Sequence, residues 1–529
     1  MQGRKRIGTG ETMKRHFNIA GPCHPEEHYM LPADLRCRGL MELIRQKQYF
    51  VIHAARQSGK TTLLLDLVKR LNESGNFYAL YCSLESVQRI AEPDQGIPAI
   101  IDTLRTAVRY HPSIPKVAET RGNESLVVAL KTYLTELSME LEKPLVILFD
   151  EIDCLSNGTL ISFLRQIRDG YVNRSTIPFV HSVGLIGMRN IRDYKGRIRE
   201  DRETLGSASP FNIVTESLTL RNFSSGEVGE LLAQRTEETG QAFPPDFVSR
   251  LFHWTRGQPW LVNAIAREVV VKMLENDVSR TPTPAEADQA AKTIVERRDT
   301  HIDSLLERLK EERVQKIVEP LILGAPRRFD LLDDDYQYVL DLGLLEERGG
   351  RLVASNPMYE EVIFRGLTAH IQARLRDLSG SEHPEYAEED HLDIGRILSD
   401  FQQFWREHSE IWRERFQYKE AAPHLVAMAF FHNIVEPGGT ITREMASGRG
   451  RLDVCVSYGG IRYPVEIKIR RDAKTRAEGV GQLARYMETL DCAEGWLLIF
   501  DPRKRPSWKK KLFWETESAR GKTIHVVGF

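Results

Sequence analysis

A strand, a loop and a helix follow one another at residues 49–68, and this succession constrains the fold more than any other stretch. It opens with an apolar run long enough for a buried strand and closes with the apolar spacing of a helix. Between them, Gly59, Lys60 and Thr61 complete the pattern of a phosphate-binding loop. In such loops backbone N–H groups and the lysine contact the β- and γ-phosphates, and the hydroxyl ligates Mg²⁺. The sequence therefore predicts a nucleotide site here.

We expect the nucleotide to contact the whole turn around the lysine. The expected nucleotide-binding residues of the loop are Gln57, Ser58, Gly59, Lys60, Thr61 and Thr62, with Thr61 also a ligand of Mg²⁺. The loop departs from G-x-x-x-x-G-K-[ST] at its first position, where Ala54 replaces glycine. Alanine disfavours positive φ, so this position decides whether the loop forms without strain.

A pair of acidic residues follows the phosphate-binding loop, at a separation that is normal for the two elements of a nucleotide site. The apolar run 144–149 ends in Asp150 and Glu151, about ninety residues after Lys60. Asp150 is expected to hold Mg²⁺, directly or through water, and Glu151 to orient or deprotonate the attacking water. Acidic residues after a buried strand are common, so the specificity comes from the combination with the loop at Lys60.

Apolar runs and helical stretches alternate through the first third of the chain. Runs at 78–84 and 179–187 have the length of buried strands, and 98–109 and 125–141 have helical spacing. This alternation predicts an α/β fold, a doubly wound parallel sheet with the nucleotide at the carboxyl edge of its strands.

Two further segments are candidates for contacts with the nucleotide. The run 179–187 is followed by Arg189 and Asn190, and Asn190 is the expected contact of the γ-phosphate, with a solvated loop as the alternative. The Gly- and Pro-containing segment 17–30 precedes the phosphate loop, and His28 or Tyr29 in it is a candidate for stacking on an adenine. A plain N-terminal loop is the alternative there.

Helical periodicity then returns and predicts a helical lid over residues 221–300. Gly257, Gln258 and Pro259 interrupt it with a turn that faces the nucleotide, and Pro259 is an expected nucleotide contact. Residues 301–377 contain helices followed by a hairpin with a two-residue Gly349-Gly350 loop, a succession typical of a winged helix. Three aspartates at 333–335 make that module acidic, which favours a protein partner over DNA.

Residues 17 to about 365 resemble the AAA-like ATPases related to the STAND signalling ATPases. The resemblance rests on the residue runs 17–22, 56–61, 150–153, 257–259 and 356–359 and covers about two-thirds of the chain. It implies an ATP-controlled, oligomerising switch with ATP and Mg²⁺ as cofactors and a winged helix after the lid. Ala54 departs from the residue that is usual in the family.

The C-terminal region carries a second set of chemically active residues. Two strands joined by a turn at 458–460 hold Asp453 on the first, and Glu466 and Lys468 two residues apart on the second. Residues two apart on a strand face the same side, and such a set is costly to bury without a purpose. The carboxylates suit Mg²⁺, and the lysine suits a water or the charge of a phosphorane.

This set resembles the PD-(D/E)xK nuclease superfamily at those three residues, over about residues 416–505. The resemblance implies Mg²⁺ as cofactor, with Mn²⁺ as a substitute, and double-stranded DNA as substrate. It implies Glu420 as a further metal ligand in the first helix and Gln482 as a catalytic residue in the helix after the core. A nuclease-type fold that binds nucleic acid without cutting it is the alternative.

Charge and composition narrow the remaining possibilities. The net charge is -2, but residues 451–529 hold 16 Lys and Arg against 10 Asp and Glu, which suits phosphate-backbone binding or, alternatively, a solubilising rim. No apolar run is long enough for a membrane span and no signal-peptide pattern follows Met1, so we expect a cytoplasmic protein without a membrane partner. The six scattered cysteines contain no C-x-x-C pair, which argues against a zinc or disulfide framework.

At 529 residues the chain is expected to form several domains. The expected domains are a P-loop ATPase core (1–220), a helical lid (221–300), a winged-helix-like domain (301–377), a linker and helix (378–415) and a restriction-endonuclease-like α/β domain (416–529). The predicted function is an oligomeric ATP-hydrolysing switch that controls a Mg²⁺-dependent DNA nuclease in prokaryotic defence against foreign DNA. The alternatives are a non-nucleolytic signalling or scaffold ATPase that binds nucleic acid, and a DNA-repair or mobile-element ATPase.

Overall fold

The computed structural model of the chain forms two compact units, residues 1–297 with 340–343 and residues 298–339 with 344–529. The residues it describes are 15–117, 125–188, 214–322, 333–350, 352–379, 386–388, 391–415, 421–435, 439–443, 454–503 and 506–529. Among these residues, no helix has both the length and the apolar character that crossing a bilayer requires.

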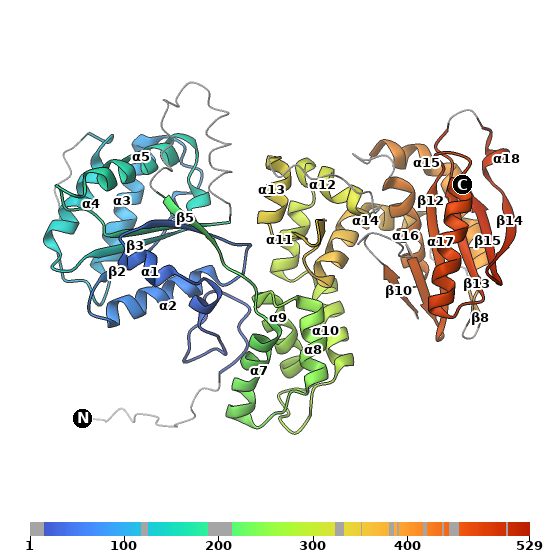
Figure 1. Cartoon of the computed structure of the whole chain (residues 1–529), viewed down its shortest axis with the longest axis horizontal. Coiled ribbons are helices and arrows are strands. Elements are labelled where there is room, and N and C mark those ends of the chain that lie inside the picture. The colour runs from blue at the N-terminus through green and yellow to red at the C-terminus, as the bar shows by residue number, and fades with distance from the viewer. Residues whose placement is uncertain are drawn as a thin grey trace, which may run out of the picture. The chain divides into compact units, whose positions relative to one another are not determined.

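The first unit is built on a five-stranded sheet of order β2-β3-β4-β1-β5, with every pairing parallel (Figure 1). Its strands are β1 (Tyr49–His53), β2 (Tyr78–Ser83), β3 (Leu145–Asp150), β4 (Ser182–Gly187) and β5 (Val214–Thr219). The predicted parallel sheet is thereby confirmed. Strand β4 lies between β1 and β3. The phosphate loop after β1 and the carboxylates after β3 therefore lie at the same edge of the sheet, separated by one strand.

Helices cover both faces of this sheet. They are η1 (Ala33–Arg36), α1 (Leu40–Arg45), α2 (Lys60–Glu73), η2 (Glu85–Val87), α3 (Pro93–Arg109), α4 (Ala129–Glu140), η3 (Ile152–Cys154) and α5 (Asn157–Asn173). Helices α3, α4 and α5 lie on one face and α1 and α2 on the other (Figure 1). Along β1, Tyr49 and Val51 pack toward the first group, whereas Phe50 and Ile52 pack toward the second. This two-sided burial explains the unbroken apolar strands in the sequence.

One helix begins earlier than the sequence predicts. We expected a helix from Pro98, but α3 begins at Pro93 and Pro98 lies inside it. A proline suits the first turn of a helix because its missing N–H has no partner there, and Pro93 already meets that condition. Pro98 therefore indicated the correct helix, but not the turn at which that helix begins.

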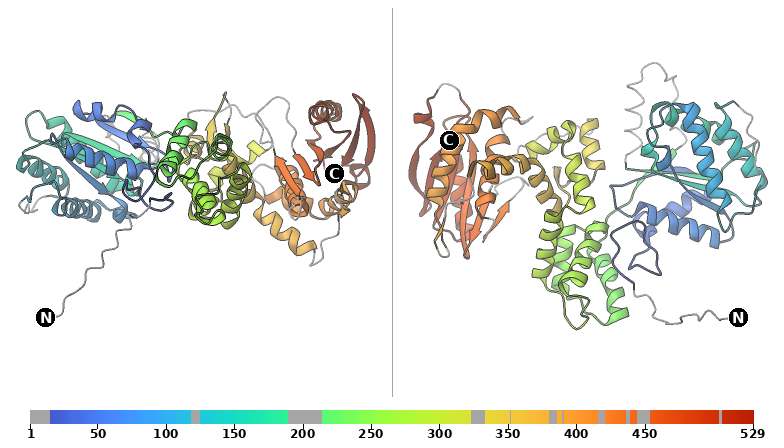
Figure 2. Two further views of the ribbon diagram at one scale, coloured as in Figure 1. Left: turned by 90° about the horizontal axis from the view of Figure 1, so that it is seen from below. Right: turned by 180° about the vertical axis from the view of Figure 1, so that it is seen from behind.

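A helical region follows the sheet, as predicted. It comprises α7 (Ser225–Thr239), α8 (Pro245–Thr255), α9 (Pro259–Arg267), the π-helical turn η5 (Glu268–Met273) and α10 (Pro284–Arg297). These helices form one bundle, visible in both views of Figure 2. Helix α7 begins with a capping box in which Ser224 and Glu227 each bond the other's backbone N–H. At the turn before α9, the Phe223 N–H donates to the Gly257 carbonyl at 2.8 Å.

The second unit begins with helices and a short hairpin. These elements are α11 (Thr300–Arg308), α12 (Glu312–Ile322), α13 (Asp334–Asp341), β6 (Leu345–Glu347), β7 (Leu352–Ala354) and α14 (Pro357–Ser379). The hairpin is present, but its loop is longer than predicted. Glu347 pairs with Leu352, so the connection between the two strands is longer than two residues. Gly349 and Gly350 both have positive φ within this longer loop, which explains the Gly-Gly signal.

A separate mixed sheet completes this unit, with strand order β10-β11-β12-β13-β15-β14. Its elements, with the short pair before them, are β8 (Ala387–Glu388), β9 (His391–Leu392), α15 (Ile394–Arg415), α16 (Ala421–Val435), β10 (Gly439–Arg443), β11 (Val454–Tyr458), β12 (Ile461–Ile469), α17 (Thr475–Leu490), β13 (Glu494–Phe500), α18 (Trp508–Lys511), β14 (Trp514–Ala519) and β15 (Lys522–Gly528). Helix α17 packs on Leu497 and Ile499, whereas Phe401 of α15 contacts Phe500 and Phe529. The two helices thus cover opposite faces of β13.

The crowding at Gly257 yields a stability prediction. A Cβ at Gly257 would lie 1.9 Å from the Phe223 carbonyl oxygen, and its φ is +75°. Gly240, also in the lid, has φ +80° but open space. Gly240→Ala is expected to cost about 1–2 kcal/mol for the left-handed backbone alone. Gly257→Ala should cost about 1–3 kcal/mol more because the clash involves rigid backbone. Urea unfolding of both variants measures the difference, and equal losses would contradict the packing described.

Candidate functional site

The phosphate loop joins the carboxyl end of β1 to the amino end of α2. Gln57 and Gly59 both have positive φ, of 56° and 89°, which turns successive peptide groups in alternate directions. Ala54 does not have a positive φ. The alanine in place of the usual glycine therefore introduces no backbone strain, and the departure from the motif is compatible with the loop.

Lys60 is held over this loop by the loop's own backbone. Its side chain is buried, and Nζ donates to the carbonyl oxygens of Ala54 at 2.8 Å and Ala55 at 3.0 Å. Burial lowers the pKa of Lys60, while the carboxylates of Glu151 and Asp150 act in the opposite direction. A cation in this position can contact a phosphate bound to the N–H groups of the same loop.

Asp150 accepts three hydrogen bonds at the end of β3. The Thr61 hydroxyl donates to Oδ2 at 2.8 Å, the Tyr81 hydroxyl donates to the same oxygen at 3.1 Å, and the Glu151 N–H donates to Oδ1 at 3.0 Å. The hydroxyl and the carboxylate that the sequence assigns to Mg²⁺ therefore meet. Oxygen donors this close together fit the ligand preference of Mg²⁺. Thr61 and Asp150 would hold the ion.

Glu151 stands at the turn that follows this strand. Its φ is +57°, an uncommon conformation for a residue with a side chain. Burial raises the pKa of Glu151, and the charge of Lys60 opposes that rise. Asp153, a little further along, accepts a hydrogen bond from the Met188 N–H and so connects the end of β3 with the end of β4. The turn thus presents a partly desolvated carboxylate beside the phosphate loop, as a general base requires.

The lid contacts the phosphate loop through Gln258. Its Nε2 donates to the Gln57 carbonyl at 3.3 Å, and its Oε1 caps α9 by accepting from the Leu261 N–H at 2.6 Å. The expected contact, Pro259, is buried in the first turn of α9. Its role as a nucleotide contact stays a prediction, but the residue before it already contacts the loop.

The N-terminal segment lies against the phosphate helix and the lid, and it does not offer the predicted stacking rings. Tyr29 is fully buried beside Phe17, and His28 is buried as well. Neither ring has a free face for a base, so the adenine-stacking prediction is wrong for both. The segment makes other contacts: the Cys23 N–H donates to the Thr62 hydroxyl at 3.0 Å, and the Ile19 carbonyl accepts from the Trp260 indole at 2.8 Å.

In the second unit, β11 and β12 form the predicted hairpin around Gly459 and Gly460, with Tyr458 paired to Ile461. On β12, Glu466 is fully buried, and the Lys468 ammonium lies 2.5 Å from its Oε1. The parallel register pairs these two residues with Leu497 and Ile499 of β13, which face α17. Both side chains therefore belong to the α17 face of the sheet.

Helix α17 approaches this pair closely. A Cβ at Gly479 would lie 3.3 Å from the Lys468 side chain and 2.8 Å from that of Leu497, so a glycine permits the approach. Gln482 follows one helical turn later and is partly exposed. The structure thus brings Glu466, Lys468 and the helix of Gln482 together.

Three predicted site residues lie outside the described part of the chain, namely Asn190, Glu420 and Asp453. Their roles stay predictions. Within the described part, no cluster of three or more His, Cys, Asp or Glu side chains forms a potential metal site. The antiparallel register pairs Val454, which follows Asp453 in the chain, with Val465, which precedes Glu466.

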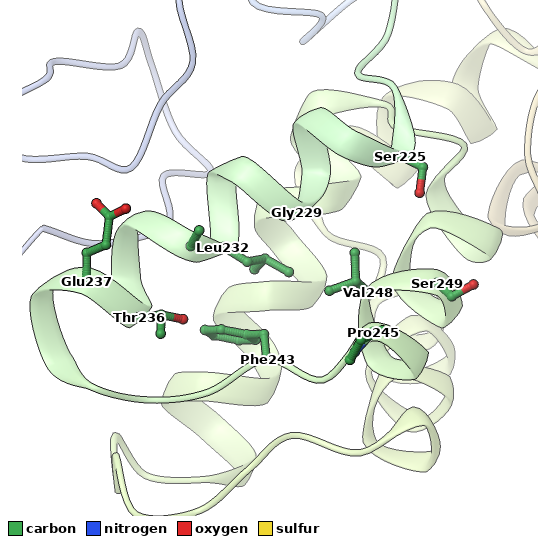
Figure 3. A pocket seen from close by; sticks show the side chains of 10 residues that line it. Ser225, Gly229, Leu232, Thr236, Glu237, Phe243, Pro245, Val248 and Ser249 are labelled. Atoms are coloured by element: carbon green, nitrogen blue, oxygen red, sulfur yellow. The ribbon is translucent and has the colours of Figure 1, made fainter.

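A groove in the lid is separate from these residues. It lies between α7 and α8 and is lined by Leu232, Phe243 and Val248 and by the more polar Thr236 and Glu237 (Figure 3). None of its lining residues belongs to the phosphate loop or to the end of β3. Its shape therefore carries no information about the nucleotide.

Two residues near the phosphate loop were not predicted. Tyr81 reaches Asp150 because β2 pairs with β3, a neighbour relation that only the strand order reveals. Arg36 donates to the Ser58 carbonyl at 3.0 Å. With Arg38 only two residues away, the sequence carries no signal that Arg36 is the buried arginine of the two.

Comparisons with known proteins match one family model and several solved structures. The family model described as "Domain of unknown function (DUF8371)" matches residues 399–504. No curated protein matches the chain. Among solved structures, the Walker-type ATPase PABY2304 of Pyrococcus abyssi is 14% identical, with a TM-score of 0.47, over 66% of this chain and 99% of that one. The Orc1 protein of Aeropyrum pernix in complex with DNA is 16% identical, with a TM-score of 0.34, over 66% and 95%.

The RuvB Holliday junction branch migration motor of Thermotoga maritima is 14% identical, with a TM-score of 0.32, and the match covers 62% of this chain and 92% of that one. At TM-scores of 0.47 and below, these likenesses carry no argument about activity. The P-loop-like fold of the first unit rests on its own strand order, on the loop at Lys60 and on the carboxylates at the end of β3.

The raised pKa of Glu151 yields a prediction about pH. A general base works only when deprotonated, so kcat/KM for ATP hydrolysis should fall as the pH drops through that pKa. Because burial raises the pKa, the midpoint of this acidic limb should lie above the ordinary value of 4.5. The limb should vanish in Glu151→Gln, whose residual rate is measured over the same pH range. A parental profile that stays flat down to pH 4.5 would contradict this assignment.

Proposed function

We propose that the chain is an ATP-binding and hydrolysing switch that controls a metal-dependent DNA nuclease carried by its C-terminal domain. The observation that carries the first half is the convergence of Lys60, Thr61, Asp150 and Glu151 at one edge of a parallel sheet. The cation, the two oxygen ligands and the carboxylate base are the groups that phosphoryl transfer to water requires. Local sequence spacing alone does not bring them together.

In this proposal each residue of the site has a distinct task. Lys60 and the N–H groups of the loop bind the β- and γ-phosphates, with the flanking Gln57 and Thr62 completing the turn. Bound Mg²⁺, held by Thr61 and Asp150, would neutralise phosphate charge. Glu151 orients the attacking water and accepts its proton, and Asn190 contacts the γ-phosphate.

The helical part that follows is proposed to transmit the state of the nucleotide. The bundle from α7 to α10 acts as the lid, and Gln258 already connects it to the phosphate loop. Helices α11 to α13 with the β6–β7 hairpin are proposed as a winged helix, whose acidic residues 333–335 favour a protein partner. Assembly into a homo-oligomer would then be the output of the switch.

The nuclease half of the proposal is supported by element order and by one ion pair. The elements α16, β10, β11, β12, α17 and β13 follow one another, with three antiparallel strands and a parallel fourth. Burying the Glu466 carboxylate is costly, and the Lys468 ammonium offsets part of that cost. Asp453 and Glu420 are proposed to join Glu466 as ligands of Mg²⁺ or Mn²⁺, with Lys468 and Gln482 acting on the scissile phosphate.

DNA is the proposed substrate, although the basic surface is smaller than the sequence suggests. Lys509 and Lys510 are exposed, whereas Lys511 is buried and donates to the carbonyl oxygens of Asp501 and Arg503. The Arg503 side chain pairs with the Asp501 carboxylate. Part of the basic sequence therefore has a structural task, and the exposed Lys509 and Lys510 are proposed to contact the phosphate backbone. Defence against foreign DNA is the proposed setting.

A second candidate is a signalling ATPase whose C-terminal fold binds nucleic acid without cutting it. The observation that favours it is the same ion pair, because a lysine bonded to Glu466 at 2.5 Å stabilises that carboxylate whether or not a metal binds. Cleavage assays separate the two candidates.

The ATPase half predicts separate losses for two substitutions. Lys60→Ala should weaken ATP binding at least about a hundredfold, because each hydrogen bond to a charged group contributes about 1.5–3 kcal/mol. Lys69→Ala, which removes an exposed lysine of the same helix, is the control. Glu151→Gln should retain ATP binding and slow hydrolysis about a hundredfold or more. Calorimetry and phosphate release measure the two effects, and parental affinity in Lys60→Ala would remove the phosphate-loop assignment.

The nuclease half predicts that metal binding and cutting can be separated. Asp453→Ala should lose metal binding and cleavage, whereas Lys468→Ala should retain metal and DNA binding and lose cleavage. Lys474→Ala removes an exposed lysine nearby and serves as the control. Cleavage of DNA with Mg²⁺, Mn²⁺ or a chelator is measured beside ATP turnover, which should stay at the parental rate in all three variants. Cleavage that survives in chelator or in Asp453→Ala would defeat the proposed mechanism.

A further inference from the structure

Arg36 is a buried arginine behind the phosphate loop. It is the last residue of η1, and only 5% of it is exposed. One nitrogen, Nη1, donates both to the Ser58 carbonyl of the loop at 3.0 Å and to the Arg221 carbonyl at 3.1 Å. Arg221 lies between β5 and the lid helix α7. One guanidinium therefore connects the loop with the start of the lid.

The carbonyl of the preceding loop residue, Gln57, also accepts a hydrogen bond from outside the loop. Gln258 of the lid donates to the Gln57 carbonyl at 3.3 Å, so two consecutive loop carbonyls accept hydrogen bonds from outside the loop. The two donors are themselves connected. Arg36 lies over the Phe223 ring at 4.8 Å, and the Phe223 N–H donates to Gly257, the neighbour of Gln258.

Peptide planarity gives these contacts a consequence for phosphate binding. In a trans peptide the C=O and the following N–H point in opposite directions. Holding the carbonyls of Gln57 and Ser58 from behind therefore turns the N–H groups of Ser58 and Gly59 toward the opposite side, where the phosphates are proposed to bind. Glycine suits position 59, because its φ is +89° and a Cβ there would lie 2.9 Å from Arg36 Nη2.

The positive charge of Arg36 is not neutralised by a salt bridge within the described part of the chain. Glu227, whose charge acts on Arg36, is itself paired with Arg221. The Nε of Arg36 is buried without a hydrogen-bond partner among the described residues. Burial lowers the pKa of Arg36 to about 10, so the side chain stays protonated at neutral pH. A buried cation next to the loop adds to the attraction for an anion.

We propose that Arg36 is a positioning residue that orients the phosphate loop and couples its conformation to the lid. The inference rests on the proposed ATP binding and adds a route by which the nucleotide changes the lid. When phosphate moves the peptide groups of the loop, the shared contacts of Arg36 and Gln258 move the segment from Arg221 to Phe223 with them.

The test compares Arg36→Met with Arg38→Met, an exposed arginine two residues away. ATP affinity is measured by calorimetry, and ATP-dependent protection from hydrogen exchange is measured separately over residues 225–297 and over the phosphate loop, residues 54–61. Arg36→Met should bind ATP about tenfold more weakly, the effect of one to two hydrogen bonds. At saturating ATP it should lose the protection of the lid but keep that of the phosphate loop. Arg36→Lys should recover part of both effects, because a single nitrogen makes both bonds.

Each result decides something. Parental affinity and parental lid protection in Arg36→Met would overturn the inference, and a parent that binds no ATP would overturn the proposed function beneath it. A purely structural role would lower stability without changing the ATP-dependent difference in the lid, and that result also overturns the inference. If Arg36→Met does not fold, Gln258→Glu takes its place, because it keeps the acceptor for the Leu261 N–H and removes the donor to Gln57. Unchanged lid protection in that variant would count against the coupling.

Discussion

The hydrogen bond from Thr61 to Asp150 joins two elements 89 residues apart in the chain, and the rest of the first unit makes it possible. Strands β1 and β3 are not neighbours, so the distance between their ends depends on β4 in between. The apolar clusters on both faces fix the strands, and the Met188 N–H binds Asp153 at the same edge. A site assembled from strand ends is therefore as rigid as the sheet that carries it.

The parts of this site that could be predicted from sequence are those that depend on local order. A glycine before Lys60, a hydroxyl after it and carboxylates after an apolar run are all visible within a few residues. Tyr81 and Arg36 could not be found that way, because each reaches the site through packing between distant elements, whereas Gln258 lies in the turn that was predicted to face the nucleotide. The sequence also cannot distinguish a buried aromatic ring from an available one, and this is why His28 or Tyr29 was a candidate for stacking on a base.

The same distinction applies to the second unit. The strand pattern gave the hairpin of β11 and β12 and placed Glu466 and Lys468 on one face, which the register confirms. Whether a carboxylate paired with a lysine serves catalysis or only balances its own burial is a question of energy rather than of pattern. The Lys468 ammonium offsets only part of the cost of burying the Glu466 carboxylate, and this energy is the same for a catalytic and for a structural pair.

We propose that nucleotide bound at Lys60 governs cutting at Lys468. The most direct measurement is the degradation of plasmid DNA by the purified full-length protein in Mg²⁺, with ATP, with a non-hydrolysable analogue and without nucleotide. We expect cleavage at a rate that changes severalfold with nucleotide. A chelator should stop this cleavage. A protein that binds DNA and turns over ATP but leaves the plasmid intact under every condition would contradict it.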